Sequence, residues 1–292
     1  MANILITGSK GQLGTELQKL GFSALDEVWF TDVDELDVSN YEAIEQFVAK
    51  NEIDTIINCA AYTAVDTAED EPELAEKINS IAVSNLAKVA YKQDCLLLHV
   101  STDYVFDGTA REPYTEKMKT SPASVYGRTK LAGEKAIINS HCMYIILRTA
   151  WLYSAYGNNF VKTIRRVATE RGVLNVVSDQ IGVPTYAEDL AKAIIRIIAD
   201  DSVVEKGGIY HFSDEGICSW YDFACEIVRL SNITCEVTPI TTEQYPTKAK
   251  RPAYSVLDKT KIKQVFAIQV PEWQDSLKRC INVLNHELKN MV

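Results

Sequence analysis

The sequence predicts an α/β fold in which a doubly wound parallel sheet is joined to a smaller C-terminal α/β lobe. Two observations carry this prediction. Short apolar runs alternate with amphipathic stretches over residues 1–185, which is typical of strands and helices that follow one another around a parallel sheet. The runs are apolar at nearly every position, as in strands that helices cover on both faces.

The elements of this first part follow in strict alternation. We expect the first helix to open at a glycine-rich turn, and the second to open at Ser39–Asn40–Tyr41–Glu42, which has the pattern of a capping box. The predicted strands are residues 3–7, 28–31, 55–58, 96–101, 144–148 and 174–177. The predicted helices are residues 11–20, 39–50, 72–92, 124–139 and 159–171.

The rhythm changes after residue 185, where strands become rare and polar loops lengthen. The expected elements are helices at 189–199, 219–230 and 271–288, a short strand at 209–212, and a loop at 239–252 that is rich in Thr, Lys and Pro. The sequence therefore predicts a main domain at 1–185 and a smaller lobe at 186–292, with segments that interleave with the main domain.

Charge and cysteine content restrict the class of protein. The formal net charge of the chain is −10, so nucleic acids and anionic membranes repel the molecule as a whole. The seven cysteines form no CxxC pair, and we expect reduced thiols instead of a disulfide framework or a zinc site. No apolar run approaches the ~20 residues of a membrane span. We expect a cytoplasmic protein without nucleic-acid or membrane partners.

The glycine-rich turn GSKGQLG follows the first predicted strand directly and opens the first predicted helix. Gly8 permits a tight turn, Gly11 leaves space where a pyrophosphate approaches the backbone, and Gly14 permits close packing of the helix. Free N–H groups and a partial positive charge at the helix N-terminus suit the phosphates. The pattern predicts a Rossmann-type site for a dinucleotide cofactor.

Asp32 ends the second predicted strand, 18 residues after Gly14. An acidic residue at that place suits hydrogen bonding to a ribose diol. No arginine stands near it to neutralise a 2′-phosphate. The cofactor is therefore expected to be NADPH or NADH, with NADH favoured.

Tyr126 and Lys130 form a Tyr-x-x-x-Lys pair at the start of a predicted helix, where residues i and i+4 share one face. A nearby ammonium group stabilises a phenolate and lowers the pKa of the tyrosine. Thr102 ends the fourth predicted strand and fits as the hydroxyl that aligns a carbonyl group. The three residues predict carbonyl reduction, with Tyr126 as the proton donor.

Longer segments resemble the dTDP-4-dehydrorhamnose reductases, a branch of the extended short-chain dehydrogenase/reductases. They are spread over nearly the whole chain, and the segments STDYVFDG and RTAWLY are the most specific. The matching segments are the glycine turn and residues 58–66, 101–108, 126–130, 148–153, 179–185 and 251–255.

The resemblance implies reduction of the C4 carbonyl of dTDP-4-dehydro-L-rhamnose to dTDP-L-rhamnose. It places Lys130 on the nicotinamide ribose, Thr102 and Asp103 on the sugar, and Trp151 against the sugar. The main domain then binds NAD(P), and the smaller lobe binds the substrate. The residues implied to line the cofactor are Gly11, Gln12, Leu13, Asp37, Val38, Ala60, Ala61 and Tyr62, where Tyr62 replaces a histidine that is usual in the family.

Physical features agree with the implied substrate. Trp151 follows the fifth predicted strand, and a flat indole suits the apolar face of a deoxysugar. Lys248, Lys250 and Arg251 form the one dense basic cluster of an acidic chain. We expect Arg251 in particular to pair with the substrate diphosphate.

Two carboxylates are candidates for metal binding. Relatives are described as holding Mg²⁺ between carboxylates at a dimer contact, and Glu16 and Glu188 stand at matching places. Lys192 stands one helical turn beyond Glu188, and its charge opposes a divalent cation. We therefore expect no tightly bound Mg²⁺, in a monomer or a homodimer. The four histidines, at 99, 141, 211 and 286, show no ligand spacing, and we expect structural or surface roles for them.

Two other functions stay open. A nucleotide-sugar epimerase or dehydratase of the same superfamily shares the glycine turn and the Tyr/Lys pair. A dehydratase usually has an acidic pair beside the hydroxyl position, whereas Asp103 follows Thr102 here without an accompanying Glu. A non-catalytic NADP-binding regulatory subunit of methionine adenosyltransferase is the other possibility, against which the intact set of Thr102, Tyr126 and Lys130 argues.

Overall fold

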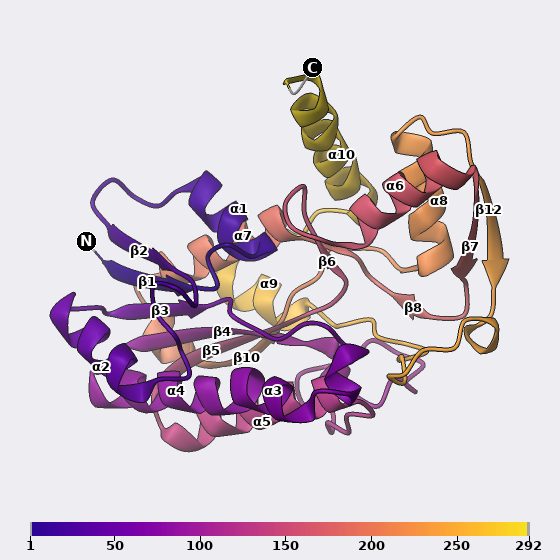
Figure 1. Cartoon of the computed structure of the whole chain (residues 1–292). Helices are drawn as coiled ribbons and strands as arrows, with labels where there is room; N and C mark the ends of the chain where they lie inside the picture. Colours follow the sequence, from indigo (N-terminus) through magenta and orange to yellow (C-terminus); the bar gives the residue numbers. More distant parts are fainter. Residues whose placement is uncertain (1, 291–292) are drawn as a thin grey trace.

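The computed structural model describes residues 2–290, with side chains to residue 286. A six-stranded parallel sheet forms its centre, in the strand order β10-β5-β4-β3-β1-β2, and helices cover both faces (Figure 1). Its strands are β1 (Asn3–Thr7), β2 (Glu27–Thr31), β3 (Thr55–Asn58), β4 (Leu96–Thr102), β5 (Met143–Thr149) and β10 (Gly208–His211). The doubly wound fold predicted from the sequence is confirmed.

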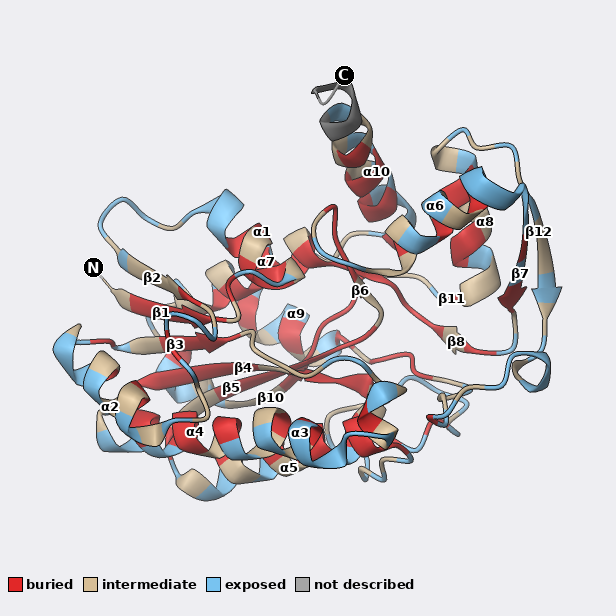
Figure 2. Cartoon of the chain, viewed as in Figure 1, coloured by how far each residue is buried: buried red, intermediate tan, exposed pale blue. Residues whose placement is uncertain are grey.

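Two hydrophobic cores sandwich this sheet, one on each face. The apolar stripe of each helix faces the strands, which places the buried residues on the inner sides of the helices (Figure 2). The helices on one face are α1 (Gln12–Leu20), α7 (Ala187–Ile198) and α9 (Thr260–Phe266). Those on the other face are α2 (Tyr41–Lys50), α4 (Ala82–Lys92) and α5 (Val125–Ser140).

A smaller lobe packs around a third core. It contains α6 (Phe160–Arg171), α8 (Trp220–Leu230) and α10 (Trp273–Asn290). Three two-stranded sheets complete it: β7 (Val173–Val177) with β12 (Glu236–Ile240), β8 (Ile181–Gly182) with β11 (Cys218–Ser219), and β6 (Leu152–Tyr153) with β9 (Thr185–Tyr186). The division of the chain at residue 185 stays a prediction.

The prediction is wrong about the last strand of the main sheet. Residues 174–177 lie in β7, outside that sheet, and β10 takes the edge position beside β5. The predicted loop at 239–252 is also partly wrong, because Pro239 and Ile240 belong to β12. Pro239 argued against a strand, but β12 has only one partner, and proline is tolerated on such an edge.

Helices α5, α6 and α8 begin at a side-chain cap, and one expected capping box is not formed. Ser124, Asn159 and Ser219 each accept a hydrogen bond from a backbone N–H of the first turn of α5, α6 and α8. The expected box at Ser39 is wrong, because Asn40 caps α2 by accepting from Ala43 N. The single helix expected at 72–92 contains α3 (Pro72–Glu76), a π-helical turn η2 (Lys77–Ile81) and α4.

A buried ion pair joins the sheet to α5. The Arg148 guanidinium on β5 donates two hydrogen bonds to Glu134, at 2.9 and 2.6 Å, and Ser101 on β4 donates a third at 2.5 Å. The Arg148 and Glu134 side chains are 3% and 1% exposed. Loss of either partner would leave a buried charge without its counter-ion. The pair therefore fixes the position of α5 relative to β4 and β5.

Candidate active site

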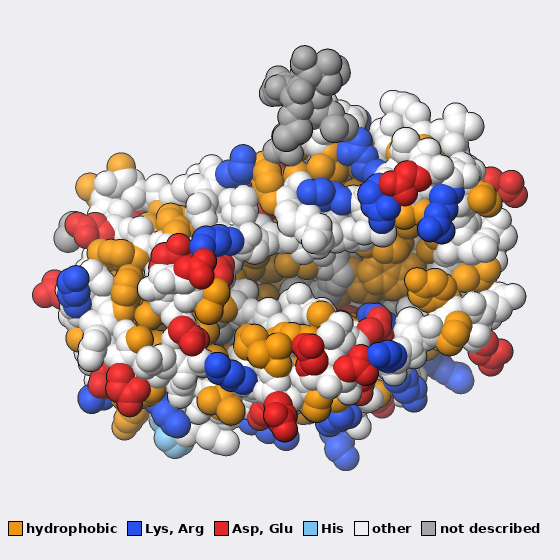
Figure 3. Space-filling view, viewed as in Figure 1, with side chains coloured by type: hydrophobic (Ala, Val, Ile, Leu, Met, Phe, Trp, Pro, Cys, Tyr) orange, Lys and Arg blue, Asp and Glu red, His pale blue; other side chains and the backbone are white. Residues whose placement is uncertain are grey.

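The site predicted from the sequence lies at the carboxyl end of the parallel sheet. The glycine turn follows β1, residues 59–62 follow β3, Asp103 follows β4 and Trp151 follows β5. Loops at this edge form the usual ligand site of a doubly wound sheet. This face is hollowed between the sheet domain and the smaller lobe, with hydrophobic side chains along the hollow (Figure 3).

The glycine turn has the geometry that a pyrophosphate needs. Gly8 has φ +67°, and a Cβ there would stand 2.6 Å from the backbone nitrogen of Ala60. A Cβ on Gly14 would stand 2.5 Å from the Gly8 carbonyl oxygen, so the turn lies directly on helix α1. Gly11 caps α1 without a side-chain hydrogen bond. First-turn N–H groups of α1 are therefore available to phosphate oxygens, and the residues fit a dinucleotide.

Asp32 stands at the rim of this turn with both carboxylate oxygens engaged. They accept hydrogen bonds from the backbone N–H groups of Lys10, at 3.0 Å, and Val33, at 2.9 Å. The Lys10 ammonium pairs nearby with Asp34 at 3.1 Å and Glu35 at 3.2 Å. Lys10 is a cation that the sequence analysis missed because it searched for arginine, and its presence removes the argument for NADH over NADPH.

The remaining residues of the predicted cofactor site differ in burial and in their hydrogen-bond partners. Leu13 is buried in the main core, so only its backbone can face a cofactor. Gln12 accepts a hydrogen bond from Asn159 at 2.9 Å. Asp37 is exposed, and hydrogen bonds from Ser39 lower its pKa. Ala60, Ala61 and Val38 are half-buried at the same edge.

Tyr62 is held in place by a residue that the sequence analysis did not single out. Asn79, in the π-helical turn, accepts from Tyr62 N at 2.9 Å and donates to Tyr62 O at 3.0 Å. The Tyr62 hydroxyl donates to Glu71 at 2.8 Å. Asn79 is fully buried, but it stands in the mixed segment KINSI, where nothing in the sequence distinguishes it from the other polar residues. π-Helical turns often mark functional sites.

Tyr126 and Thr102 share a hydrogen bond, and Lys130 stands one helical turn beyond Tyr126 on α5. Thr102 ends β4, and its hydroxyl donates to Asp103 at 2.9 Å and accepts from Tyr104 N at 3.2 Å. Burial raises the pKa of Tyr126, and its hydrogen bond with Thr102 opposes that rise. The Tyr126 ring meets Tyr104 edge to face at 5.5 Å. The lowered tyrosine pKa expected from the sequence is not found in the protein itself, because desolvation outweighs the favourable contacts.

Lys130 is almost completely buried, at 1% exposure. Its ammonium group donates to the Val100 carbonyl oxygen at 2.7 Å and lies 3.3 Å from His99 Nε2. Burial lowers the pKa of Lys130 to about 8, and Glu134 opposes that fall. A lysine with this pKa changes charge close to neutral pH, which an exposed lysine does not.

Asp103 is a buried carboxyl group with spare hydrogen-bonding capacity. It is 3% exposed, and among the described residues its Oδ2 lacks a well-formed hydrogen bond. Burial raises the pKa of Asp103 to about 6, and hydrogen bonds from Thr102 and Ser255 oppose the rise. Buried polar atoms without partners indicate a place that a ligand or water completes.

Two tryptophans form an aromatic wall at this edge. Trp151 has φ +47° and stacks on Trp220 at 3.6 Å, with 10° between the ring planes. A Cβ on Gly182 would stand 2.6 Å from the Trp151 indole. One face of Trp151 is therefore covered, and Trp220, which the sequence analysis missed, contributes to the same wall.

The basic cluster docks onto the segment that follows β3. Arg251 donates to Asp66 at 2.5 Å and to the Tyr104 hydroxyl at 3.0 Å. Lys248 pairs with Asp70. The two cations are thus neutralised by carboxylates, and an anionic ligand would compete with those carboxylates for them.

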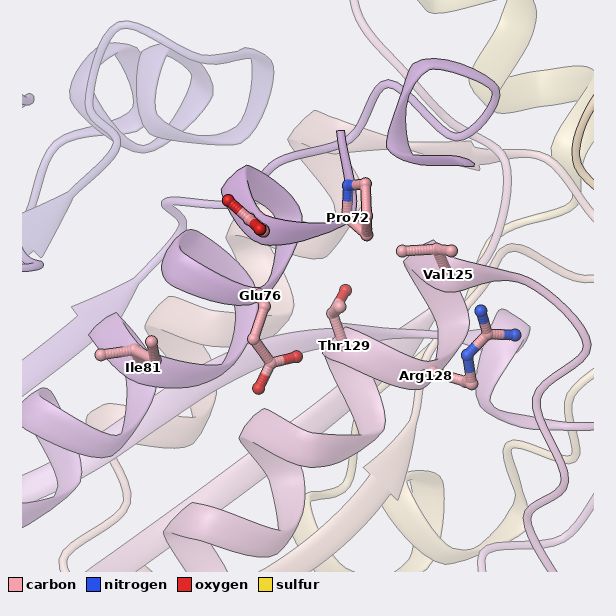
Figure 4. Close-up of a pocket in the computed structure, with 7 residues that line it drawn as sticks. Pro72, Glu76, Ile81, Val125, Arg128 and Thr129 are labelled. Atoms are coloured by element: carbon pink, nitrogen blue, oxygen red, sulfur yellow. The ribbon is translucent and has the colours of Figure 1, made fainter. Parts of the chain in front are cut away.

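A separate groove of about 590 Å³ lies between the α3–η2 segment and α5 (Figure 4). Its lining includes Pro72, Glu76, Ile81 and Arg128. None of the site residues predicted from the sequence lines it. Val125 and Thr129, which also line it, flank Tyr126 on α5.

The two carboxylates considered for Mg²⁺ have other partners. Glu16 is buried and accepts from Ser154 at 2.6 Å, and Glu188 pairs with Lys192. Among the described residues, no three His, Cys, Asp or Glu side chains are grouped as metal ligands. The expectation that no Mg²⁺ is tightly bound stays a prediction.

All seven cysteines are free, and no helix in the described part is long and apolar enough to cross a membrane.

A doubly wound sheet with a glycine turn after β1, a hydroxyl at the end of β4 and a Tyr-x-x-x-Lys pair on α5 defines a short-chain dehydrogenase/reductase. The chain matches the family described as the RmlD substrate binding domain over residues 1–286. It belongs to the dTDP-4-dehydrorhamnose reductase family, as the resemblance indicated.

Individual relatives cover almost the entire chain. A dTDP-4-dehydrorhamnose reductase of Aggregatibacter actinomycetemcomitans is 46% identical, over 95% of this chain and 98% of its own length. The crystal structure of a dTDP-4-dehydrorhamnose reductase from Clostridium acetobutylicum has 46% identity and a TM-score of 0.92, covering 97% of this chain and 99% of that one. A Bacillus anthracis reductase in complex with NADP has 38% identity and a TM-score of 0.91, covering 97% and 100%.

Proposed function

We propose that the protein reduces the C4 carbonyl of dTDP-4-dehydro-L-rhamnose to dTDP-L-rhamnose, with NADPH or NADH as the hydride donor. One observation carries the proposal: Tyr126 is hydrogen-bonded to Thr102 at the end of β4, and Lys130 is buried one helical turn beyond it on α5, in a chain 46% identical to a named reductase. The bound reduced nicotinamide supplies the hydride. The chain's own residues hold the reactants and move the proton.

Tyr126 gives its hydroxyl proton to the carbonyl oxygen as hydride arrives at the carbon. Thr102 donates a hydrogen bond to the same oxygen, for which its hydroxyl leaves Asp103. Lys130 holds positive charge beneath the phenolate that remains. Because Tyr126 has a raised pKa, it is fully protonated at neutral pH and ready to act as an acid.

The proposed sugar site uses Asp103 and the wall of Trp151 and Trp220. The diphosphate of the substrate replaces Asp66 and Asp70 as the partner of Arg251 and Lys248. This exchange places a dianion on cations that the protein already neutralises, which favours charged nucleotide sugars over free sugars. We place the enzyme in the cytoplasm, as a monomer or homodimer acting on a small molecule.

The test is an oxidation assay with NADPH and NADH, with dTDP-4-dehydro-L-rhamnose made in situ by upstream enzymes. The expected result is consumption of one reduced cofactor for each dTDP-L-rhamnose formed, identified by NMR and mass. An epimerase or dehydratase recycles its cofactor, so product without net oxidation would overturn the proposal. Cofactor binding without turnover, with co-purification of a methionine adenosyltransferase, would favour the regulatory role.

A further inference from the structure

His99 is a buried titratable group that the mechanism described above does not use. It lies in the middle of β4 at 0% exposure. Its two ring nitrogens face different partners: Nδ1 lies 2.9 Å from the Asn58 side-chain amide, and Nε2 lies 3.3 Å from Lys130 Nζ. Asn58, His99 and Lys130 therefore form one continuous polar row from β3 through β4 to α5.

The orientation of the Asn58 amide is determined by its other neighbour. The backbone N–H of Ala60 points at the Asn58 side chain at 3.1 Å and can only donate, so the atom that it meets is the oxygen. The Thr7 hydroxyl donates to the same oxygen at 2.7 Å. The amide nitrogen of Asn58 must then face His99 and donate to Nδ1.

This direction determines the tautomer of His99. A neutral imidazole that accepts at Nδ1 carries its proton on Nε2. The Nε2–H group therefore points at Lys130 Nζ. An amine nitrogen accepts that hydrogen bond, whereas an ammonium group meets it donor to donor.

We propose that Asn58 and His99 are positioning residues that favour the amine form of Lys130, so that this lysine exchanges a proton close to neutral pH instead of remaining a permanent cation. The proposal rests on the proposed reductase function. It assigns to the Asn58–His99 pair a role that is separate from packing.

The proton balance of the step is closed. The Tyr126 O–H bond breaks as its proton bonds to the carbonyl oxygen, and hydride from the reduced cofactor bonds to the carbon. The phenolate that remains takes a proton from solvent. When the Lys130 ammonium loses a proton to solvent, one of its N–H bonds breaks, and the amine that is left accepts the hydrogen bond from His99 Nε2–H.

The charged surroundings of Lys130 are consistent with this assignment. On α5 itself, Glu134 favours the ammonium form, but Arg148 and Ser101 already engage that carboxylate. From β3, the Cys59 thiol has a pKa raised to about 12 and is neutral. From β4, burial and Lys130 lower the pKa of His99 well below its ordinary value, so the imidazole is neutral too.

The first experiment determines the tautomer of His99 in the unsubstituted protein. Long-range proton–nitrogen NMR spectra of histidine-labelled protein distinguish the two imidazole tautomers, and a His99→Phe variant identifies the His99 signals. The expected result is a proton on Nε2 and none on Nδ1 between pH 6 and 9. A proton on Nδ1 would overturn the proposal.

The second experiment measures Lys130 directly, in protein labelled with carbon-13 at lysine Cε, and Lys130→Arg identifies the signal. The expected titration midpoint is near 8 in the parent protein. Loss of one hydrogen bond in His99→Phe is expected to raise the midpoint by roughly half to one pH unit. Asn58→Asp, whose carboxylate accepts from Nδ1–H and reverses the tautomer, is expected to raise it further.

His211→Phe is the matched control, because His211 is equally buried but its Nδ1 bonds the Tyr114 carbonyl oxygen and no member of this row. Its Lys130 midpoint is expected to match that of the parent protein. An unchanged midpoint in both His99→Phe and Asn58→Asp refutes the role of the pair.

The pH profile of reductase turnover then connects the pair to catalysis. Activity is expected to fall as pH rises through the Lys130 midpoint, and this alkaline limb is expected to move upward in His99→Phe by the same amount. If the tautomer and the midpoint shift are as expected but the protein does not reduce the sugar, the proposed function has failed and this inference has not.

Discussion

Replacing Asp103 with asparagine is expected to stabilise the protein at neutral pH. The carboxyl group is 3% exposed, and burial raises its pKa from 3.8 to about 6. An acid with a raised pKa in the folded state binds protons more tightly there than in the unfolded chain, so its ionisation opposes folding. At about 1.4 kcal/mol per pH unit, the rise corresponds to about 3 kcal/mol of folding free energy lost at pH 7.

Because the pKa of Asp103 is raised, the difference in stability between Asp103→Asn and the parent protein depends on pH, and this dependence can be measured. The cost is absent where the carboxyl is protonated in both states, and grows as pH rises from about 4 to about 6. The asparagine side chain has the same shape as the aspartate without its charge. Urea unfolding of Asp103→Asn and the parent protein should therefore differ by about 1–3 kcal/mol at pH 7, and by less than about 1 kcal/mol at pH 4.

Two results would refute this reasoning. If Asp103→Asn is less stable than the parent at pH 7, the carboxylate makes contacts in the fold that outweigh its desolvation. If the difference in stability is the same at pH 4 and pH 7, Asp103 has an ordinary pKa. Asp107, an exposed acid in the next loop whose pKa is lowered by Tyr114, is the control, because Asp107→Asn should not stabilise the protein.

Three further outcomes are expected. Tyr126→Phe should cut the turnover number by ~10² or more with cofactor affinity unchanged in a fluorescence titration; full turnover would contradict its role as the acid. Glu134→Gln should cost about 3–5 kcal/mol in urea unfolding, because it leaves the Arg148 charge buried without its carboxylate; a loss below about 1 kcal/mol would show that water or another group reaches it. Arg251→Met should raise the substrate KM about tenfold or more with little change in kcat, because it removes a charge-assisted hydrogen bond to phosphate. An unchanged KM would place the diphosphate elsewhere. Lys250→Met, at an exposed neighbouring residue, is the control.

The sequence predicted local features better than pairings between distant segments. The glycine turn, the Tyr126–Lys130 pair and the helix starts expected at Ser124 and Ser219 depend on residues a few positions apart, and the two helices begin directly after Ser124 and Ser219. The edge strand of the main sheet did not follow from the sequence, because β7 and β10 are both short apolar runs. Their pattern carries no information about which sheet each one joins.

The site shows the same limit. Thr102 could be located by the strand that it ends, but Trp220 reaches Trp151 only through the packing of the two parts of the molecule. His99 was expected to have a structural or surface role. Its contact with Lys130 spans β4 and α5, and neither spacing nor composition reveals a pairing across two elements.

β10 is the last strand of the main sheet to be synthesised, and this affects folding of the nascent chain. β5 is an inner strand that needs a neighbour on each side, and one neighbour, β10, ends only at His211. A nascent chain that has left the ribosome up to residue 185 therefore carries an uncovered strand edge, which invites pairing with other chains. Fragments that stop before β10 should aggregate during synthesis, and shortening this protein to its nucleotide-binding portion would require a substitute for that strand.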